Sequence, residues 1–169
     1  MVKTKNIYIV PIRKRDRKLV VSDVRAHSDI LKYALDFPLP EGTPILAVKE
    51  GIVVNVVDKF NKGGDGKRYF KYLNFITIEH KNKEISQYGH LKYHGACVKI
   101  GDKVKTGEII GYTGNTGWTT EPHLHFHVCK NTDNKNGWKT MQVRFKEKLK
   151  YFTNSKENLT KFRSKQTIS

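Results

Sequence analysis

Hydrophobic residues in this chain fall into short runs in which apolar and polar positions tend to alternate. Such alternation is typical of β-strands, because successive side chains of a strand point to opposite faces. The pattern predicts strands over residues 7–12, 18–22, 33–37, 44–48, 51–58, 71–80, 84–91 and 122–129. Residues 27–130 show no helical period, and a short helix is expected only over residues 155–163. We therefore predict a mainly β fold with little helix, an antiparallel sandwich or open barrel.

The length of 169 residues suffices for one domain with a hydrophobic core. We expect a single domain, residues 1–169, whose core covers about residues 20–130. Residues 1–19 form a basic N-terminal segment and residues 131–169 a basic C-terminal extension. No run approaches the roughly 18 apolar residues of a membrane-spanning helix.

Positive charge is concentrated at the two ends of the chain. The net charge is +16, and residues 1–25 and 144–169 each hold eight basic and two acidic residues. A uniformly basic DNA-binding face would not be distributed in this way. The basic ends predict attraction to an anionic polymer or surface, such as nucleic acid, an anionic cell wall or an acidic membrane. The alternative is that they are simply solvated.

The sequence His123-Leu124-His125 is the strongest chemical signal in the chain. Side chains two positions apart on a strand share a face, about 7 Å apart. One imidazole can then bind a metal while its neighbour carries a proton. His127 continues the alternation on the same face. A His-x-His pair taken alone is equally typical of exposed or hydrogen-bonded histidines.

Two upstream residues complete a metal-binding pattern. Asp36 lies between Leu35 and Phe37, and His27 precedes this strand. A carboxylate within an apolar strand is costly unless it is paired or binds a cation. Two histidines, one aspartate and an open fourth position for water form a catalytic zinc arrangement. A further histidine, His90, follows Tyr88-Gly89 and could orient water or stabilise an oxyanion.

Together these motifs resemble the lysostaphin-type zinc metalloendopeptidases. The resemblance covers about residues 27–128, and its segments are His27, residues 34–37, 41–51, 88–91, 101–111, 114–117 and 122–126. It implies a duplicated hybrid motif, with His27, Asp36 and His125 binding Zn²⁺ and His90 and His123 acting as catalytic residues. It also implies hydrolysis of short peptide bonds, in the cross-links or stems of peptidoglycan.

One spacing departs from the family pattern. In lysostaphin-like members the first histidine and the aspartate lie closer together than the nine positions that separate His27 from Asp36. Asp29 is therefore a rival ligand. Asp36 is preferred because it lies in the matching strand, whereas Asp29 lies in a polar loop.

Two other classes of function remain open. One is a non-catalytic metal-binding or carrier module of the same fold that binds cell wall or an acidic partner. The other is a nucleic-acid protein driven by the basic ends, although the middle of the chain has no recognised helix or aromatic platform for it. Residues 7–12 are too short for a signal-peptide core. The sequence thus predicts a cytoplasmic chain, unless another route releases it to act outside the cell or at a wall. The oligomeric state is left open.

Overall fold

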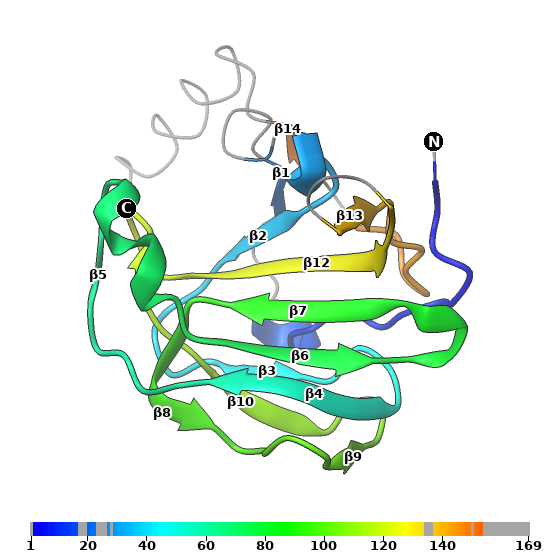
Figure 1. Cartoon of the computed structure of the whole chain (residues 1–169), viewed down its shortest axis with the longest axis horizontal. Coiled ribbons are helices and arrows are strands. Elements are labelled where there is room, and N and C mark those ends of the chain that lie inside the picture. The colour runs from blue at the N-terminus through cyan, green and yellow to red at the C-terminus, as the bar shows by residue number, and fades with distance from the viewer. Residues whose placement is uncertain are drawn as a thin grey trace.

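The computed structural model describes residues 2–16, 20–22, 27, 29–133, 137–149 and 151–153. β-Strands dominate this part of the chain, and its helical elements are short 3-10 segments (Figure 1). The helical segments are η1 (Lys14–Asp16), η2 (Asp29–Leu31), η3 (Lys67–Tyr72) and η4 (Lys81–Lys83). The strands are β1 (Val20–Ser22), β2 (Leu35–Pro38), β3 (Pro44–Leu46), β4 (Gly51–Val57), β5 (Gly63–Gly64), β6 (Phe75–Glu79), β7 (Ile85–Gly89), β8 (Leu91–Ala96), β9 (Lys103–Val104), β10 (Ile109–Thr113), β11 (Gly117–Trp118), β12 (His123–Asn131), β13 (Trp138–Met141) and β14 (Tyr151–Thr153).

Most of these strands belong to one large sheet. Its order is β14-β1-β2-β12-β7-β6-β4-β9, and β13 pairs with β12 in addition. A smaller sheet has the order β3-β10-β8, and β5 pairs with β11. The pairs within the two larger sheets are antiparallel except β1 with β14. The predicted mainly β, antiparallel architecture is thus confirmed.

The hydrophobic core joins the large and the small sheet. Along β12, Leu124, Phe126 and Val128 are buried in it, alternating with the histidines. The small sheet contributes Ile45 and Ile110. The apolar half of the alternation therefore fixes β12 on the core, and the register leaves the histidines on the opposite face.

The core also includes chain on either side of the expected 20–130 region. Tyr8, Val10 and Ile12 are fully buried in it, and Phe145 packs against it. The Tyr8 hydroxyl donates to the carboxylate of the buried Glu84 at 2.8 Å. The backbone N–H groups of residues 5 and 6 donate to the same carboxylate. Both flanking segments are thus part of the folded body.

Several predicted boundaries differ from the structure. Residues 7–12 are an extended segment with isolated bridges rather than a regular strand, because single backbone contacts with residues 45 and 145 replace a ladder. The strand predicted over residues 71–80 begins only at Phe75, because residues 67–72 form η3. The helix expected over residues 155–163 lies outside the described residues.

Candidate metal centre and catalytic site

Three adjacent strands of the large sheet bring the predicted site residues together. β12 carries His123 and His125 and lies between β2 and β7. In the register of these strands, His125 stands opposite Asp36 on one side and Gly89 on the other. Cβ atoms of directly opposed residues lie about 5 Å apart. The pairing of β2 with β12 therefore sets the carboxylate beside the imidazole.

His27, Asp36 and His125 form a compact set of ligand atoms. One donor atom from each lies within 4.8 Å of the other two. The Nδ1 atom of His125 lies 2.9 Å from Asp36 Oδ1, and the Nε2 atom of His27 lies 3.3 Å from Asp36 Oδ2. Zinc–ligand distances of about 2.0–2.2 Å place the ligand atoms of a tetrahedral site roughly 3.3 Å apart. Both the spacing and the donor types fit a zinc ion.

The Asp36 carboxylate is the negative centre of this set. Burial would raise its pKa, but hydrogen bonds from His125 and His27 outweigh this effect and hold the pKa well below its ordinary value. Asp36 is therefore ionised at neutral pH, as a metal ligand must be. The described part of the chain has two groups of possible metal ligands, this one and His90, His123 and His125. The rival carboxylate, Asp29, is exposed in η2 and belongs to neither of them.

His127 is an additional member of the site. It is buried, its ring stacks on Trp138, and its Nδ1 atom lies 3.3 Å from His125 Nε2. Burial, aided by the neighbouring His125 and His27, holds its pKa well below the ordinary value, so the ring is neutral. If His125 binds a metal through Nδ1, its proton lies on Nε2 and can be donated to His127 Nδ1.

The strand alternation already predicted that His127 shares a face with His123 and His125, but it assigned His127 no role. The missing information was the covering residue, Trp138. This tryptophan belongs to β13, a later strand that pairs with β12. Sequence spacing gave no indication of that pairing.

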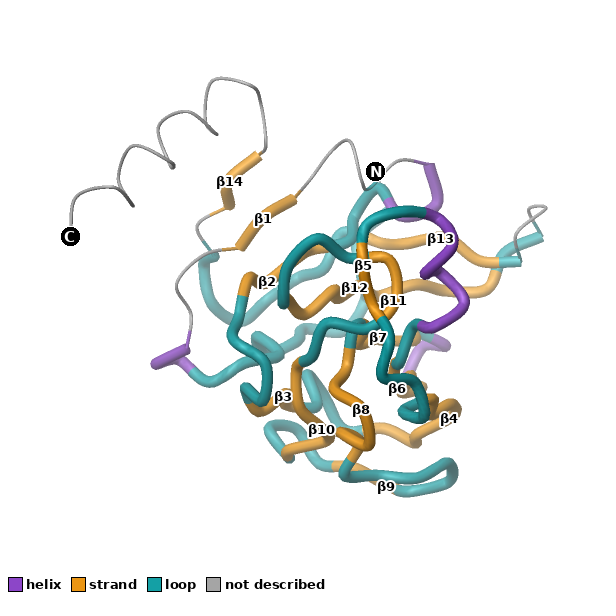
Figure 2. The backbone as a smooth tube through the Cα atoms, turned by 90° about the vertical axis from the view of Figure 1, so that its left-hand side faces the viewer, coloured by secondary structure: helices purple, strands orange, loops and turns teal. Residues whose placement is uncertain are grey.

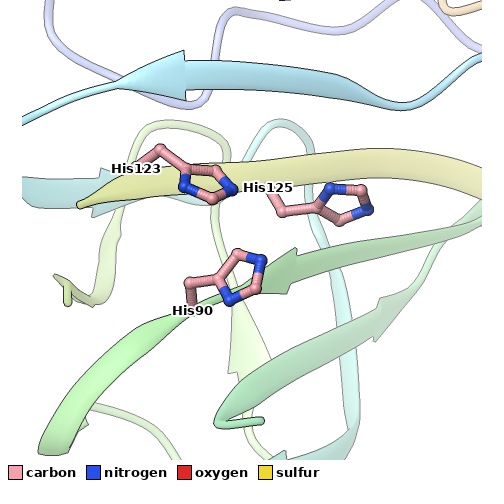
Figure 3. Close-up of side chains that lie close together, drawn as sticks. All are labelled: His90, His123 and His125. Atoms are coloured by element: carbon pink, nitrogen blue, oxygen red, sulfur yellow. The ribbon is translucent and has the colours of Figure 1, made fainter. Parts of the chain in front are cut away.

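His90 and His123 lie side by side at the end of β12, facing His125 (Figure 3). Their ring centroids are 4.4 Å apart. The Nδ1 atom of His90 lies 2.6 Å from the backbone oxygen of Thr116, and that of His123 lies 2.9 Å from the backbone oxygen of Glu121. Because a carbonyl oxygen only accepts, both Nδ1 atoms carry the proton and both Nε2 atoms are left as bases in the neutral rings.

The surroundings of His90 favour its neutral imidazole. Burial, together with the nearby His123 and His125, lowers the pKa of His90 to about 3. The Nε2 atom of His123 lies 3.7 Å from Asp36 Oδ1, so His123 reaches the edge of the ligand set. Neutral histidines beside a candidate metal centre can accept and return protons.

The segment of residues 116–119 holds both of these histidines. In addition to the Thr116 contact with His90, the Thr119 hydroxyl lies 3.3 Å from His123 Nδ1. Strand β11 lies within this segment and pairs with β5, and Figure 2 shows η3 beside both strands. His90 itself has a φ of 60°, a left-handed conformation that costs energy in a residue with a Cβ atom. Long-range contacts therefore impose the orientation of the pair.

The other histidines lie away from this centre. His80 is buried between Glu50 and Ser86, and His94 is exposed on β8. Of the aromatic residues near these segments, Tyr88 is fully buried and Trp118 is 43% exposed.

Comparison with known proteins adds the family. Residues 31–137 match the family described as Peptidase family M23, a stretch that includes Asp36, His90, His123 and His125. The chain belongs to peptidase family M23. This confirms the predicted family and, with the sheet topology, the predicted fold class. The matched stretch begins after His27, whose place in the site rests on the geometry above.

Other M23 proteins resemble this chain over its central region. An uncharacterized metalloprotease of Buchnera aphidicola subsp. Baizongia pistaciae is 40% identical over 122 residues, 71% of this chain and 29% of the relative. The peptidoglycan DD-endopeptidase ShyC of Vibrio cholerae is 35% identical over 69% of this chain and 23% of its own length. This M23 chain thus spans about a quarter of the length of these relatives.

A solved structure supports the same M23 architecture. The catalytic domain of the antimicrobial peptidase lysostaphin from Staphylococcus simulans is 33% identical, with a TM-score of 0.50 over 65% of this chain and 75% of that one. A zinc-containing peptidase from Vibrio cholerae aligns with a TM-score of 0.56 at 25% identity, over 86% of this chain and 41% of that one. Among the described residues of this M23 chain, no helix has the length and apolar character needed to cross a membrane.

Proposed function

We propose that this chain is a zinc-dependent endopeptidase that hydrolyses peptide bonds of peptidoglycan, in its cross-links or stem peptides. The observation that carries the proposal is the His27–Asp36–His125 donor set beside two histidines with basic Nε2 atoms, in a chain of peptidase family M23. The substrate is suggested by the similarity to ShyC, a peptidoglycan DD-endopeptidase, and to lysostaphin, a peptidase.

His27, Asp36 and His125 would hold the zinc ion, through His27 Nε2, a carboxylate oxygen and His125 Nδ1. A zinc ion bound there supplies a Lewis acid that polarises the scissile carbonyl group. The chain contributes the remaining steps. His127 Nδ1 accepts a hydrogen bond from His125 Nε2–H and so fixes the ligand tautomer.

His123 and His90 serve as the proton carriers. One neutral Nε2 atom takes a proton from the attacking water, and an imidazolium N–H returns a proton to the leaving amine. A protonated Nε2 atom can also donate a hydrogen bond to the oxyanion. Their Nδ1 protons remain committed to Thr116 and Glu121, so each ring keeps one orientation throughout.

The test is a paired measurement of zinc content and peptidoglycan hydrolysis on the same preparations. Asp36→Ala and His125→Ala are expected to lose zinc, while Asp29→Ala keeps it. His90→Ala and His123→Ala are expected to keep zinc and to lose about 100-fold or more in turnover. His94→Ala, which removes an exposed histidine, is the control. Full zinc occupancy in both Asp36→Ala and His125→Ala would contradict the ligand set.

The same preparations separate the alternative of a non-catalytic module. Such a module leaves purified peptidoglycan and synthetic stem peptides uncleaved, with or without zinc. Soluble products of defined mass that depend on His90 and His123 would support the endopeptidase, whereas their absence from wild-type protein loaded with zinc would overturn it.

The basic ends of the chain suggest a second binding partner in addition to the peptide substrate. They carry most of the net charge of +16, and the middle is nearly neutral. We infer that they attract the enzyme to an anionic polymer at its site of action and take no part in the chemistry.

A further inference from the structure

A hollow of about 690 Å3 lies on the loop around η3. Its side chains are basic, aromatic or amide groups; they are Asn61, Lys62, Arg68, Tyr69, Lys71 and Tyr72. We call it the 61–72 hollow. None of the candidate metal ligands or catalytic histidines lines it.

The cations of this hollow are held by aromatic rings. The Nζ atoms of Lys62 and Lys71 lie 5.6 and 5.2 Å from the centroid of the Tyr72 ring. The Arg68 guanidinium lies 5.0 Å from the centroid of Tyr69. These cation–π contacts restrict the long side chains without removing their charge. The hollow therefore presents preorganised positive charge.

No carboxylate in the described part of the chain forms an ion pair with these cations. No ion pair there involves Lys62, Arg68 or Lys71. The acidic residue of the loop, Asp65, instead accepts a hydrogen bond from the indole N–H of Trp118 at 3.1 Å. An anionic group is thus the ligand that the charge of the hollow favours.

The hollow is connected to the catalytic histidines through the segment of residues 116–119. The N–H of Gly117 donates to the backbone oxygen of Lys62 at 3.0 Å, and that of Thr119 to the backbone oxygen of Gly64 at 3.1 Å. On its other side this same short segment holds both catalytic histidines. The same short segment therefore contacts both the loop of the hollow and the two proposed catalytic histidines.

We propose that the 61–72 hollow binds a free carboxylate of the peptide substrate and makes the enzyme selective for acidic peptides. The inference rests on the proposed endopeptidase function. An arginine guanidinium recognises a carboxylate through paired N–H donors, and Lys71 adds a second positive charge. A hollow of about 690 Å3 has room for an acidic side chain together with neighbouring groups of a peptide. Its link to the segment of residues 116–119 favours a substituent of the reacting peptide over a separate molecule.

The experiment compares two synthetic stem peptides that differ in one group. One carries a free side-chain carboxylate next to the scissile bond, and the other carries the corresponding carboxamide. The measured quantity is the ratio of kcat/KM for the acid to that for the amide. Wild-type protein is expected to prefer the acid about tenfold or more, and Arg68→Gln/Lys71→Gln to reduce the ratio about tenfold, the usual effect of losing charged hydrogen bonds.

The matched control removes two positive charges elsewhere. Lys103 and Lys105 are exposed on and next to β9, at the edge of the large sheet remote from β2 and β12. Lys103→Gln/Lys105→Gln is expected to keep the wild-type ratio. A similar fall in this control would show general electrostatic attraction and overturn the proposal of a specific hollow.

Two further outcomes separate this proposal from the proposed function. If wild-type protein cleaves both peptides equally well, the endopeptidase stands and the carboxylate site is wrong. If it cleaves neither peptide, the proposed function fails, and the hollow is then tested by the affinity of wild-type protein for the fluorescently labelled acid and amide. Equal affinities in that measurement would overturn the hollow as well.

Discussion

At the scale of single residues, the site depends on which nitrogen of each histidine carries a proton. The backbone oxygens of Thr116 and Glu121 fix the proton on Nδ1 of His90 and His123, the two histidines proposed to be catalytic. His125 needs its proton on Nε2 instead, because its Nδ1 atom faces Asp36 in the ligand set and would bind the metal. A neutral His127 can accept a hydrogen bond from that Nε2–H.

The role of His127 gives a first prediction. His127→Phe retains a ring that can stack on Trp138 but removes the acceptor for His125 Nε2–H. We expect zinc affinity to fall about 10–100-fold, the usual effect of losing an outer partner of a metal ligand. The check is competition with a chelator, with His94→Phe on exposed β8 as the control. Unchanged zinc affinity in His127→Phe would leave His127 a packing residue only.

His80 gives a prediction for stability against pH. Its Nδ1–H donates to the backbone oxygen of Glu50, and its Nε2 accepts from the Ser86 hydroxyl, each at 2.8 Å. Burial lowers its pKa in the folded protein below the ordinary value of 6.5. The unfolded chain therefore binds a proton that the folded chain does not, and His80 reduces stability as pH falls below about 6.5.

The measurement is urea unfolding between pH 7.5 and 5.5 at constant zinc. We expect the unfolding midpoint of wild-type protein to fall with pH, and His80→Gln to show a smaller fall over the same interval. His94→Gln should follow the wild-type slope. Parallel slopes in wild type and His80→Gln would contradict the assignment of this buried histidine.

At the scale of elements, the pairing of β5 with β11 positions the segment of residues 116–119, which contacts the two proposed catalytic histidines. A Cβ atom added to Gly63 would lie 1.7 Å from the backbone oxygen of Asn115, so no other residue fits there without movement of one strand. Asn115 is next to Thr116, the residue that holds His90. A displacement of the chain at Gly63 would therefore also shift Thr116 and change the position of His90.

Gly63→Ala tests this coupling. We expect turnover to fall about 10–100-fold, because a shift of roughly 1 Å in a catalytic group has that effect. Zinc content should stay the same, since the proposed ligands Asp36 and His125 lie on β2 and β12 and not in this loop. Lys67→Ala, an exposed change in the same loop, is the control. Equal turnover in wild-type and Gly63→Ala protein would show that the loop and the catalytic pair are independent.

At the scale of the whole molecule, the two basic ends have mixed roles. Phe145 packs against the core, and its backbone bridges to Tyr8. Removal of residues 144–169 would therefore damage the core as well as the charge. Residues 154–169 lie outside the described region and hold four basic residues and one acidic residue.

Deleting residues 154–169 isolates the effect of charge. We expect weaker binding to an anionic polymer at low ionic strength and nearly unchanged turnover on a small soluble peptide. The difference in binding between the two proteins should shrink above about 0.5 M salt, where charges separated by several ångströms are screened. The measurement is co-sedimentation at a series of salt concentrations. Binding of wild-type protein that does not change with salt would contradict the electrostatic role.

The sequence by itself determined the β class, because the apolar and polar alternation of its strands fixes which face packs on the core. The same alternation placed His123, His125 and His127 on one face. The ordered motifs indicated the family, and an aspartate between apolar residues indicated a paired carboxylate. These properties depend on local spacing, which the sequence contains in full.

Only the tertiary structure decided which distant groups meet. The register of β2 on β12 brings Asp36 against His125, β13 covers His127, and the segment of residues 116–119 orients His90 and His123. The departures at residues 7–12 and 67–72 have the same origin, since isolated bridges and a 3-10 segment replaced the ladders that local pattern predicted. Strand pairing between remote segments depends on the packing of the whole chain, and hydrophobic spacing along the sequence does not specify it.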